Sequence, residues 1–168
     1  MATPDFVLRL RDKIGTDPLW LSGVTAVVVR GDDLLLVKRS DTGAWTPVTG
    51  VIDPGEHPAD AGVRECLEEA DVVVVPERLA RLGVTAPIVY DNGDETQYID
   101  LTFRMRWVSG EPFPADGENT EAGWFPIADL PRVGETGTVS DHMLERILAA
   151  LADTSAAEFT AAGSIVRH

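Results

Sequence analysis

The chain has 168 residues, of which 44% are hydrophobic and 25% are charged. This length suits one well-filled core and is short for two, so we expect a single domain over residues 1–152 and a weakly ordered tail over 153–168. Acidic residues outnumber basic ones by 28 to 14, which gives a formal charge of −14. Such a charge disfavours bulk binding to nucleic acid or to an anionic membrane, because both depend on basic patches. A small polyanionic substrate fits this charge if a bound metal ion and a few arginines receive it.

Cysteine usage and hydropathy indicate the compartment. Cys66 is the only cysteine, so no disulfide forms within the chain, and its apolar neighbourhood predicts a buried thiol. The first residues lack the pattern of a leader, and no apolar run approaches the length of a membrane span. These features predict a cytoplasmic protein without a membrane partner.

Apolar periodicity and turn residues divide the chain into predicted helices and strands. Gly31-Asp32 predicts a hairpin turn, Pro58 suits the first turn of a helix, and Pro76 is expected to stop a strand. In chain order we expect a helix over 5–14, strands over 24–30 and 33–39, a helix over 58–71, strands over 72–75, 79–90, 97–108 and 124–127, and a helix over 142–151. Hairpins around a central helix, in place of regular βαβ repeats, indicate an α+β fold with a mixed sheet between helices.

The central helix carries three closely spaced carboxylates. Glu65, Glu68 and Glu69 fall within roughly a 100° arc of a helix, and we expect this face to lie in solvent. Cys66 and Leu67 fall on the opposite face, which we expect to meet the core. Like charges at this spacing repel, so the stripe needs a compensating cation, and hard oxygen ligands favour Mg²⁺ or Mn²⁺ over zinc.

The same segment resembles the signature of the Nudix hydrolases, G-x5-E-x7-R-E-U-x-E-E-x-G-U, in which U is an apolar residue. Two positions depart from it: Asp71 replaces the last glycine, and Val48-Thr49 replaces the Pro-Gly that usually precedes the first one. The matching residues are Gly50, Glu56, Arg64, Glu65, Cys66, Glu68, Glu69 and Val72. The resemblance implies the Nudix α/β/α sandwich with a mixed β-sheet.

The resemblance also implies an activity and a metal site. Members of this family hydrolyse a nucleoside diphosphate linked to another group, with Mg²⁺ or Mn²⁺ as cofactor. By this likeness Glu65, Glu68 and Glu69 hold the metal, and the backbone carbonyl of Thr49 or Gly50 adds an oxygen ligand. The partner is then a small nucleotide, and a homodimer, which is common in the family, is a possible assembly.

Two further groups have expected catalytic roles. Arg64 is expected to grip Glu56 and a metal-binding carboxylate together and so fix their positions, although a plain surface ion pair would show the same residues. The general base is either a glutamate of the helix, such as Glu65, or one from the later acidic loop. In that loop we favour Glu118 over Glu121.

The residues that contact the substrate are less defined by the sequence. Aromatic residues that stack on a base and basic residues that meet phosphates both lie at strand positions, where core packing or surface charge is the commoner role. The aromatic candidates are Trp45, Tyr90, Tyr98 and Trp124, and the basic ones are Lys38, Arg39, Arg104 and Arg106.

The preferred substrate type is ADP-ribose or a nucleotide sugar. Two alternatives remain: hydrolysis of modified nucleoside triphosphates, and an idle nucleotide sensor, which would tolerate loss of the carboxylates that this chain keeps. Isopentenyl diphosphate isomerase chemistry fits poorly, because Cys66 lies inside the signature and leaves no separate catalytic thiol.

Overall fold

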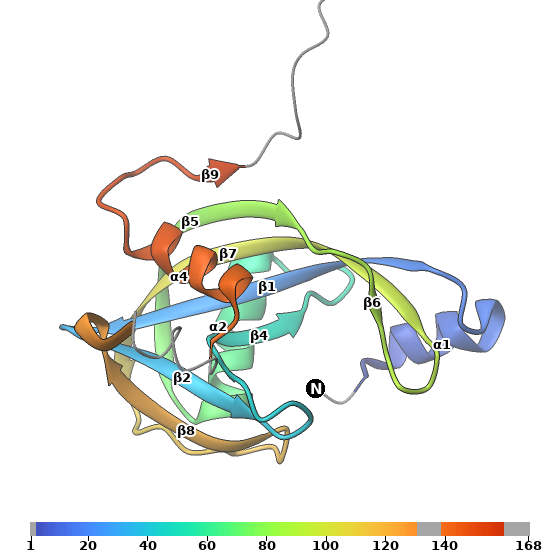
Figure 1. The fold of residues 1–168 in the computed structure, drawn as a ribbon, viewed down its shortest axis with the longest axis horizontal. Coiled ribbons are helices and arrows are strands. Elements are labelled where there is room, and N and C mark those ends of the chain that lie inside the picture. Colours follow the sequence, from blue (N-terminus) through green and yellow to red (C-terminus); the bar gives the residue numbers. More distant parts are fainter. Residues whose placement is uncertain (1–2, 131–138, 160–168) are drawn as a thin grey trace, which may run out of the picture.

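The computed structural model describes residues 3–130 and 139–159. Within these ranges a nine-stranded mixed sheet lies between helices (Figure 1). The elements are α1 (Asp5–Ile14), β1 (Leu19–Arg30), β2 (Asp33–Arg39), β3 (Trp45–Thr46), β4 (Val48–Val51), α2 (Pro58–Ala70), β5 (Val73–Val84), β6 (Ile88–Val89), β7 (Glu95–Ser109), β8 (Asn119–Pro126), a 3-10 turn (Ile127–Asp129), α4 (Asp141–Leu151) and β9 (Glu158–Phe159).

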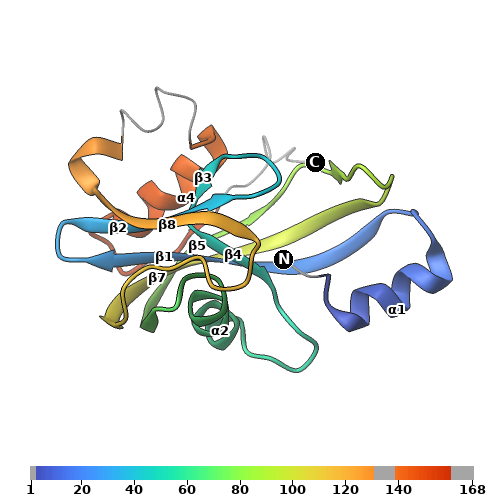
Figure 2. The same ribbon diagram turned by 90° about the horizontal axis from the view of Figure 1, so that it is seen from below.

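The strand order is β3-β2-β1-β7-β5-β9, with β4 beside β1, β6 beside β7 and β8 beside β2. β1 and β7 run parallel, as do β5 and β9, and the other pairs are antiparallel. β2 pairs with β1 only next to their hairpin turn, and β4 takes the same edge of β1 further along, at residues 23–26. Figure 2 shows α2 and α4 on opposite faces of the sheet. The predicted α+β sandwich with a mixed sheet is confirmed.

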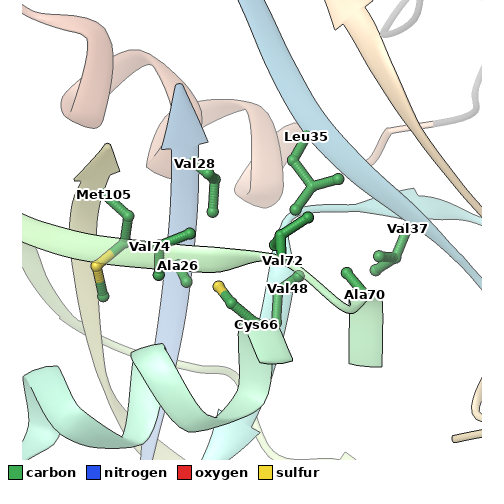
Figure 3. Packing of buried hydrophobic residues seen from close by; sticks show 10 residues of the cluster. All are labelled: Ala26, Val28, Leu35, Val37, Val48, Cys66, Ala70, Val72, Val74 and Met105. Atoms are coloured by element: carbon green, nitrogen blue, oxygen red, sulfur yellow. The ribbon is translucent and has the colours of Figure 1, made fainter. Parts of the chain in front are cut away.

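Two apolar cores, one under each helix, follow from the strand sequences. Ala26 and Val28 of β1 belong to the cluster that includes Cys66 of α2 (Figure 3), whereas Val27 and Val29 belong to the cluster under α4. Successive side chains of a strand point to opposite faces of the sheet. A strand with a core on each face therefore has apolar residues at consecutive positions of its sequence. The buried Cys66 thiol confirms its predicted place in the core.

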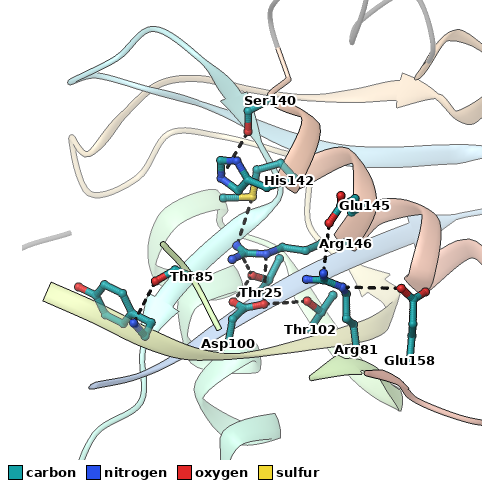
Figure 4. A network of polar contacts seen from close by, with 12 residues as sticks. Thr25, Arg81, Thr85, Asp100, Thr102, Ser140, His142, Glu145, Arg146 and Glu158 are labelled. Atoms are coloured by element: carbon teal, nitrogen blue, oxygen red, sulfur yellow. Dashed lines mark hydrogen bonds and ion pairs between the residues drawn. The ribbon is translucent and has the colours of Figure 1, made fainter. Parts of the chain in front are cut away.

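A buried ion pair fixes α4 on the sheet. Arg146 Nε lies 3.2 Å from Asp100 Oδ2, and both side chains are at most 7% exposed. Thr25 and Thr102 donate their hydroxyls to the two oxygens of Asp100, at 2.8 and 3.0 Å (Figure 4). Charges removed from water need this kind of compensation, so the network joins α4 to β1 and β7 as one unit.

Most predicted elements are found, and several strands are longer or differently divided. β5 continues through Pro76, where we expected it to stop: Pro76 lies opposite Met105 of β7, and the register shifts directly after it, an irregularity typical of proline in a strand. The strand predicted over 79–90 is also wrong, since β5 ends at Val84 and β6 is separate. β3 and β4 form within the expected loop before α2, and β8 begins at Asn119, earlier than predicted.

Part of the predicted tail is described. Glu158 and Phe159 pair with Arg81 and Leu82 as the short strand β9, and residues 160–168 lie outside the described residues. The division into a domain over 1–152 and a tail stays a prediction. None of the helices in the described ranges has the length and apolar character that crossing a membrane requires.

Candidate active site

Helix α2 carries the carboxylates and ends on a left-handed residue. Asp71 has φ 54° and donates its backbone N–H to the carbonyls of Cys66 and Leu67. It is the only non-glycine residue with positive φ among the described residues. Aspartate enters this conformation more readily than most residues, so the helix closes as it would with the glycine of the signature.

The prediction that all three carboxylates lie in solvent is wrong, because two of them are buried. Glu65 and Glu69 are 5% and 4% exposed, whereas Glu68 is exposed and Leu67, predicted to face the core, is 52% exposed. The reason is that small residues, Ala61, Gly62, Cys66 and Ala70, make the close approach of α2 to the sheet. This rotates one edge of the helix, with Glu65 and Glu69, toward β4 and the segment before β8.

Gly50 of β4 touches the carboxyl group of Glu65. A Cβ built on Gly50 would lie 2.1 Å from the Glu65 carboxyl carbon, so only glycine leaves this space. The unusual Val48-Thr49 before it belongs to the strand: Val48 is fully buried, and Thr49 pairs with Thr25 of β1. The departure from Pro-Gly is therefore accommodated as regular β-structure, and Gly50 keeps its place against α2.

Arg64 joins the carboxylates of this site to one another. Its Nε and Nη2 donate to the two oxygens of Glu56 at 2.9 and 3.0 Å. Its Nη1 donates to Glu65 at 2.9 Å and to Glu68 at 3.0 Å. Nη2 also reaches the carbonyl of Val51 on β4 at 3.1 Å. The expected contact with Glu56 and a helix carboxylate is present, and it includes two such carboxylates.

The electrostatics leave negative charge uncompensated. Burial raises the pKa of Glu65 to about 7, against the opposing effect of Arg64. Burial and the charge of Glu65 raise the pKa of Glu69 to about 7 as well. Hydrogen bonds from Arg64 lower the pKa of Glu56. One guanidinium thus serves several carboxylates, and buried oxygens of this kind fit a divalent cation.

A second group of acidic side chains completes the site from the segment before β8. Asp116 and Glu118 each bring a carboxylate oxygen within 4.8 Å of Glu69 and of each other. Asn119 donates from Nδ2 to Glu69 Oε2 at 3.2 Å. The sequence led us to expect Glu118 here and missed Asp116, which lies two residues before it. The alternative base, Glu121, lies further along β8 and binds Lys38 at 2.7 Å.

The backbone explains why Asp116 and Glu118 meet. Asp116 Oδ1 accepts the backbone N–H of Glu118 at 3.0 Å, which closes a tight turn. The carbonyl of Glu118 accepts the N–H of Ser40, at the end of β2, at 2.9 Å. The turn therefore holds the two carboxylates over Glu69. An Asp-x-Glu pattern directly before a strand is the signal that could have identified Asp116.

Most of the residues that the sequence suggested for substrate contact have other partners in the structure. Trp45 packs edge-on against Phe125 beside the α4 core, and Trp124 packs against Trp107 beside the α2 core. Arg104 and Arg106 both lie near Glu77, at 2.9 and 3.5 Å. Lys38 is held by Glu121, as described above.

Arg39 is the basic candidate near the carboxylates. It forms two hydrogen bonds with Asp41, at 2.9 and 2.6 Å. Its pKa is raised mainly by Asp41, with smaller contributions from the charges of Glu69 and Tyr90. The charges of Glu69 and of Tyr90, one of the tyrosine candidates, therefore both act on Arg39.

Comparison with known proteins agrees with this geometry. The sequence profile of the NUDIX domain matches residues 20–147. A NAD-capped RNA hydrolase NudC of Pseudomonas syringae pv. syringae is 29% identical over 140 residues, which are 82% of this chain and 48% of that protein. The corresponding protein of Pseudomonas aeruginosa is 30% identical over 125 residues, 73% of this chain and 42% of the relative. The chain therefore spans about half the length of the curated relatives it matches.

Solved structures show the same fold. A NUDIX hydrolase from Nitrosomonas europaea has a TM-score of 0.62 and 26% identity over 77% of this chain and 86% of its own. An ADP-ribose pyrophosphatase from Streptococcus suis has a TM-score of 0.59 and 23% identity. The match covers 83% of this chain and 96% of that protein. A Nudix-type fold with a site lined by carboxylates is thus the class that the geometry defines. The chain belongs to the NUDIX family.

Proposed function

We propose that this chain hydrolyses the diphosphate bond of a nucleoside diphosphate linked to another group, with ADP-ribose or a nucleotide sugar as the preferred substrate type. One observation carries the proposal: Arg64 holds Glu56, Glu65 and Glu68 together beside the buried Glu69. Burying carboxylates costs free energy, so an ordinary acidic surface helix is not expected to bury two of them and group its carboxylates around one guanidinium. Mg²⁺ or Mn²⁺ is the proposed cofactor.

The donor set suits such a cation. We assign Glu65, Glu68 and Glu69 as ligands, with the carbonyl of Thr49 or Gly50, and we add Asp116, which has a carboxylate oxygen within 4.8 Å of one of Glu69. A bound divalent ion neutralises diphosphate charge and lowers the pKa of a water that it binds. The fixed carboxylates supply hard oxygen atoms at little entropic cost, because Arg64 already holds two of them.

The other roles follow from position. Arg64 and Glu56 act as positioning residues, because they set the geometry of Glu65 and Glu68. Glu118 is the proposed general base and would take the proton of the attacking water, in preference to the helix glutamate Glu65. The carboxylate of Glu118 lies within 4.8 Å of that of Glu69, whereas Glu65 is already engaged by Arg64, which supports this preference.

The curated relatives favour one addition to the substrate set. Since two of them are NAD-capped RNA hydrolases, a dinucleotide such as NAD is a second candidate class. RNA itself would bring its phosphate backbone to a surface of formal charge −14, so we propose small nucleotides as the main partners. The cytoplasm is the proposed compartment.

A substrate screen tests the proposal. The purified protein is incubated with Mg²⁺ or Mn²⁺ and with ADP-ribose, nucleotide sugars, NAD, dinucleoside polyphosphates or modified nucleoside triphosphates, and the products are separated by chromatography. We expect metal-dependent release of a nucleoside monophosphate from a diphosphate-linked substrate. Turnover of triphosphates alone would support the first alternative. Nucleotide binding without any turnover would support the sensor and contradict the hydrolase.

A further inference from the structure

Two tyrosines, Tyr90 and Tyr98, lie side by side where β6 and β7 pair. Tyr98 is on β7, and Tyr90 follows β6; their hydroxyl oxygens are 3.1 Å apart. Tyr90 is 43% exposed, and burial together with the neighbouring hydroxyl raises the pKa of Tyr98. Of the four aromatic residues that the sequence suggested, these two are outside both cores. The ring of Tyr90 is therefore exposed to a ligand, and that of Tyr98 lies half-buried beside it.

The space beside Tyr98 connects it with the metal-site strand. A Cβ built on Gly23 of β1 would lie 3.4 Å from Tyr98 Cδ1 and 3.5 Å from the carbonyl oxygen of Gly50. The three heavy atoms nearest to such a Cβ all belong to Tyr98 and Gly50. Gly50 in turn touches the carboxyl group of Glu65. Bare backbone at Gly23 thus separates an aromatic ring from the strand that borders the carboxylates.

The turn that carries Tyr90 is held in place from outside. Arg11 of α1 donates to the carbonyl of Glu95 at 2.7 Å and to Thr96 Oγ1 at 2.9 Å. Within the turn, Tyr90 donates its N–H to the carbonyl of Asp94 at 2.9 Å. Helix α1, which lies at the far end of the sheet in Figure 1, thereby fixes the hairpin and with it the position of Tyr90.

The charge around the tyrosines is balanced. The charges of Arg11 and, less strongly, Arg39 act on the pKa of Tyr98. Asp94 lies 3.6 Å from Arg11 Nε, and Asp41 pairs with Arg39 through two hydrogen bonds. A flat group without charge of its own suits this environment better than a second phosphate does. Aromatic rings of this kind stack on nucleobases, with little preference for sequence because every base has a π-face.

We propose that Tyr90, Tyr98 and the bare backbone of Gly23 form the subsite that receives the base of the nucleotide. This inference rests on the proposed function, since it assigns part of the same substrate. The phosphates then extend past Gly50 toward Glu65 and Glu69, and the base determines affinity, while the carboxylates determine turnover.

Binding of products tests the subsite without turnover. Dissociation constants for AMP, GMP, CMP and UMP, and for ribose 5-phosphate, are measured calorimetrically in the presence of Mg²⁺. Tyr90→Ala should weaken binding of the preferred nucleotide by about tenfold, the loss of one stacked ring, and leave ribose 5-phosphate unchanged. Tyr90→Phe should bind the nucleotide nearly as the wild type does. Phe159→Ala, which removes an exposed aromatic ring on β9, is the matched control.

A second variant probes the space itself. Gly23→Ala adds a methyl group that meets only ordinary contacts, so the protein should keep its Tm. It should weaken nucleotide binding, whereas Gly123→Ala, the same change in β8 with Phe125 at 3.7 Å, should not. Unchanged affinity in both Tyr90→Ala and Gly23→Ala, equal weakening of ribose 5-phosphate, or no nucleotide binding by the wild type would overturn the subsite. Failure of the proposed function would instead appear as absence of hydrolysis in the substrate screen.

Discussion

Arg64 and Glu56 are eight residues apart and face each other through two parallel hydrogen bonds, Nε to Oε1 at 2.9 Å and Nη2 to Oε2 at 3.0 Å. Glu56 lies in the turn before α2, and Arg64 lies in the second turn of that helix. Because the remaining Nη1 holds Glu65 and Glu68, the guanidinium ties the approach to the helix to its acidic face. A planar fork can do this, and an ammonium group cannot.

Arg64→Lys should therefore impair the site while keeping the charge. We expect metal affinity or kcat to fall by about 10- to 100-fold, as for other groups that orient metal ligands. Mn²⁺ titration and steady-state kinetics measure the two effects. Arg106→Lys, at a largely exposed arginine paired with Glu77, should behave as the wild type. Equal activity of Arg64→Lys and the wild type would show that the fork has no positioning role.

Gly50→Ala should separate metal binding from folding. The added methyl group would displace the Glu65 carboxyl, which is the end of a flexible side chain, so we expect only a small loss of Tm. The displaced carboxylate leaves its place beside Arg64, and Mn²⁺ affinity should drop clearly. Gly123→Ala serves as control, since its methyl group would make only an ordinary contact with Phe125 at 3.7 Å. Unaltered Mn²⁺ affinity in Gly50→Ala would remove Glu65 from the ligand set.

Glu118→Gln and Glu121→Gln distinguish the two candidates for the general base. Glu118 lies in the cluster with Glu69 and Asp116, whereas Glu121 binds Lys38 on the neighbouring strand. Loss of a general base typically lowers the rate by about 10² to 10⁴-fold, and we expect a fall in this range in kcat for Glu118→Gln alone. The pH profile of kcat should lose its acidic limb in the same variant. A large loss in Glu121→Gln instead would reverse the assignment.

The elements that the sequence predicted correctly are those that turn or capping residues mark directly. The hairpin at Gly31-Asp32 and the helix start at Pro58 depend on turn and capping residues, and both are found. The burial of Glu69 and the exposure of Leu67 could not be predicted, because the contacts of α2 with β4 and with the segment before β8 determine which edge of the helix is covered.

Tertiary contacts also decided which side chains form the site. Asp116 lies in a loop whose Gly, Pro and acidic composition is typical of solvated segments, and only its turn onto Glu69 distinguishes it. Trp124 and Tyr98 are both aromatic residues at predicted strand positions. One enters a core and the other does not, because that choice depends on which helix covers each part of the sheet.

The buried pair of Asp100 and Arg146 should dominate the stability of the α4 side. Asp100→Asn leaves the guanidinium without its countercharge, so we expect the free energy of unfolding to fall by about 3 kcal/mol. Arg146→Met in addition removes the uncompensated charge and should recover part of this loss. Urea unfolding of the two single variants and the double variant measures the coupling. Additive losses would show that the two side chains do not act as a pair.

The stability of the metal-free protein should depend on pH through Glu65 and Glu69. Their pKa values are raised from 4.5 to about 7 in the folded state, so the folded protein holds more protons than the unfolded chain between these values. Their contribution to stability is therefore present at the acidic end of this window and is lost as the pH rises toward about 7. The pKa of Glu56 is lowered in the folded state, so its contribution to stability is lost as the pH falls below 4.5, outside the pH range in which Glu65 and Glu69 act.

Thermal unfolding in a chelator measures this dependence. Glu69→Gln removes one of the two groups and should flatten the decline of Tm with rising pH. Added Mg²⁺ should raise the Tm of the wild type more at the alkaline end, where both carboxylates are ionised and free to bind it. The same slope in the wild type and in Glu69→Gln would contradict the assignment of these pKa shifts.

The central claim is that the buried carboxylates of α2 hold the metal ion that hydrolysis requires. Hydrolysis of ADP-ribose, or of the best substrate from the screen, by the wild type and by Glu69→Gln tests it directly, with Mn²⁺ binding measured on the same samples. We predict that Glu69→Gln stays folded, loses Mn²⁺ affinity and loses turnover by orders of magnitude. Full turnover in Glu69→Gln, or turnover by the wild type in the presence of a chelator, would contradict the account.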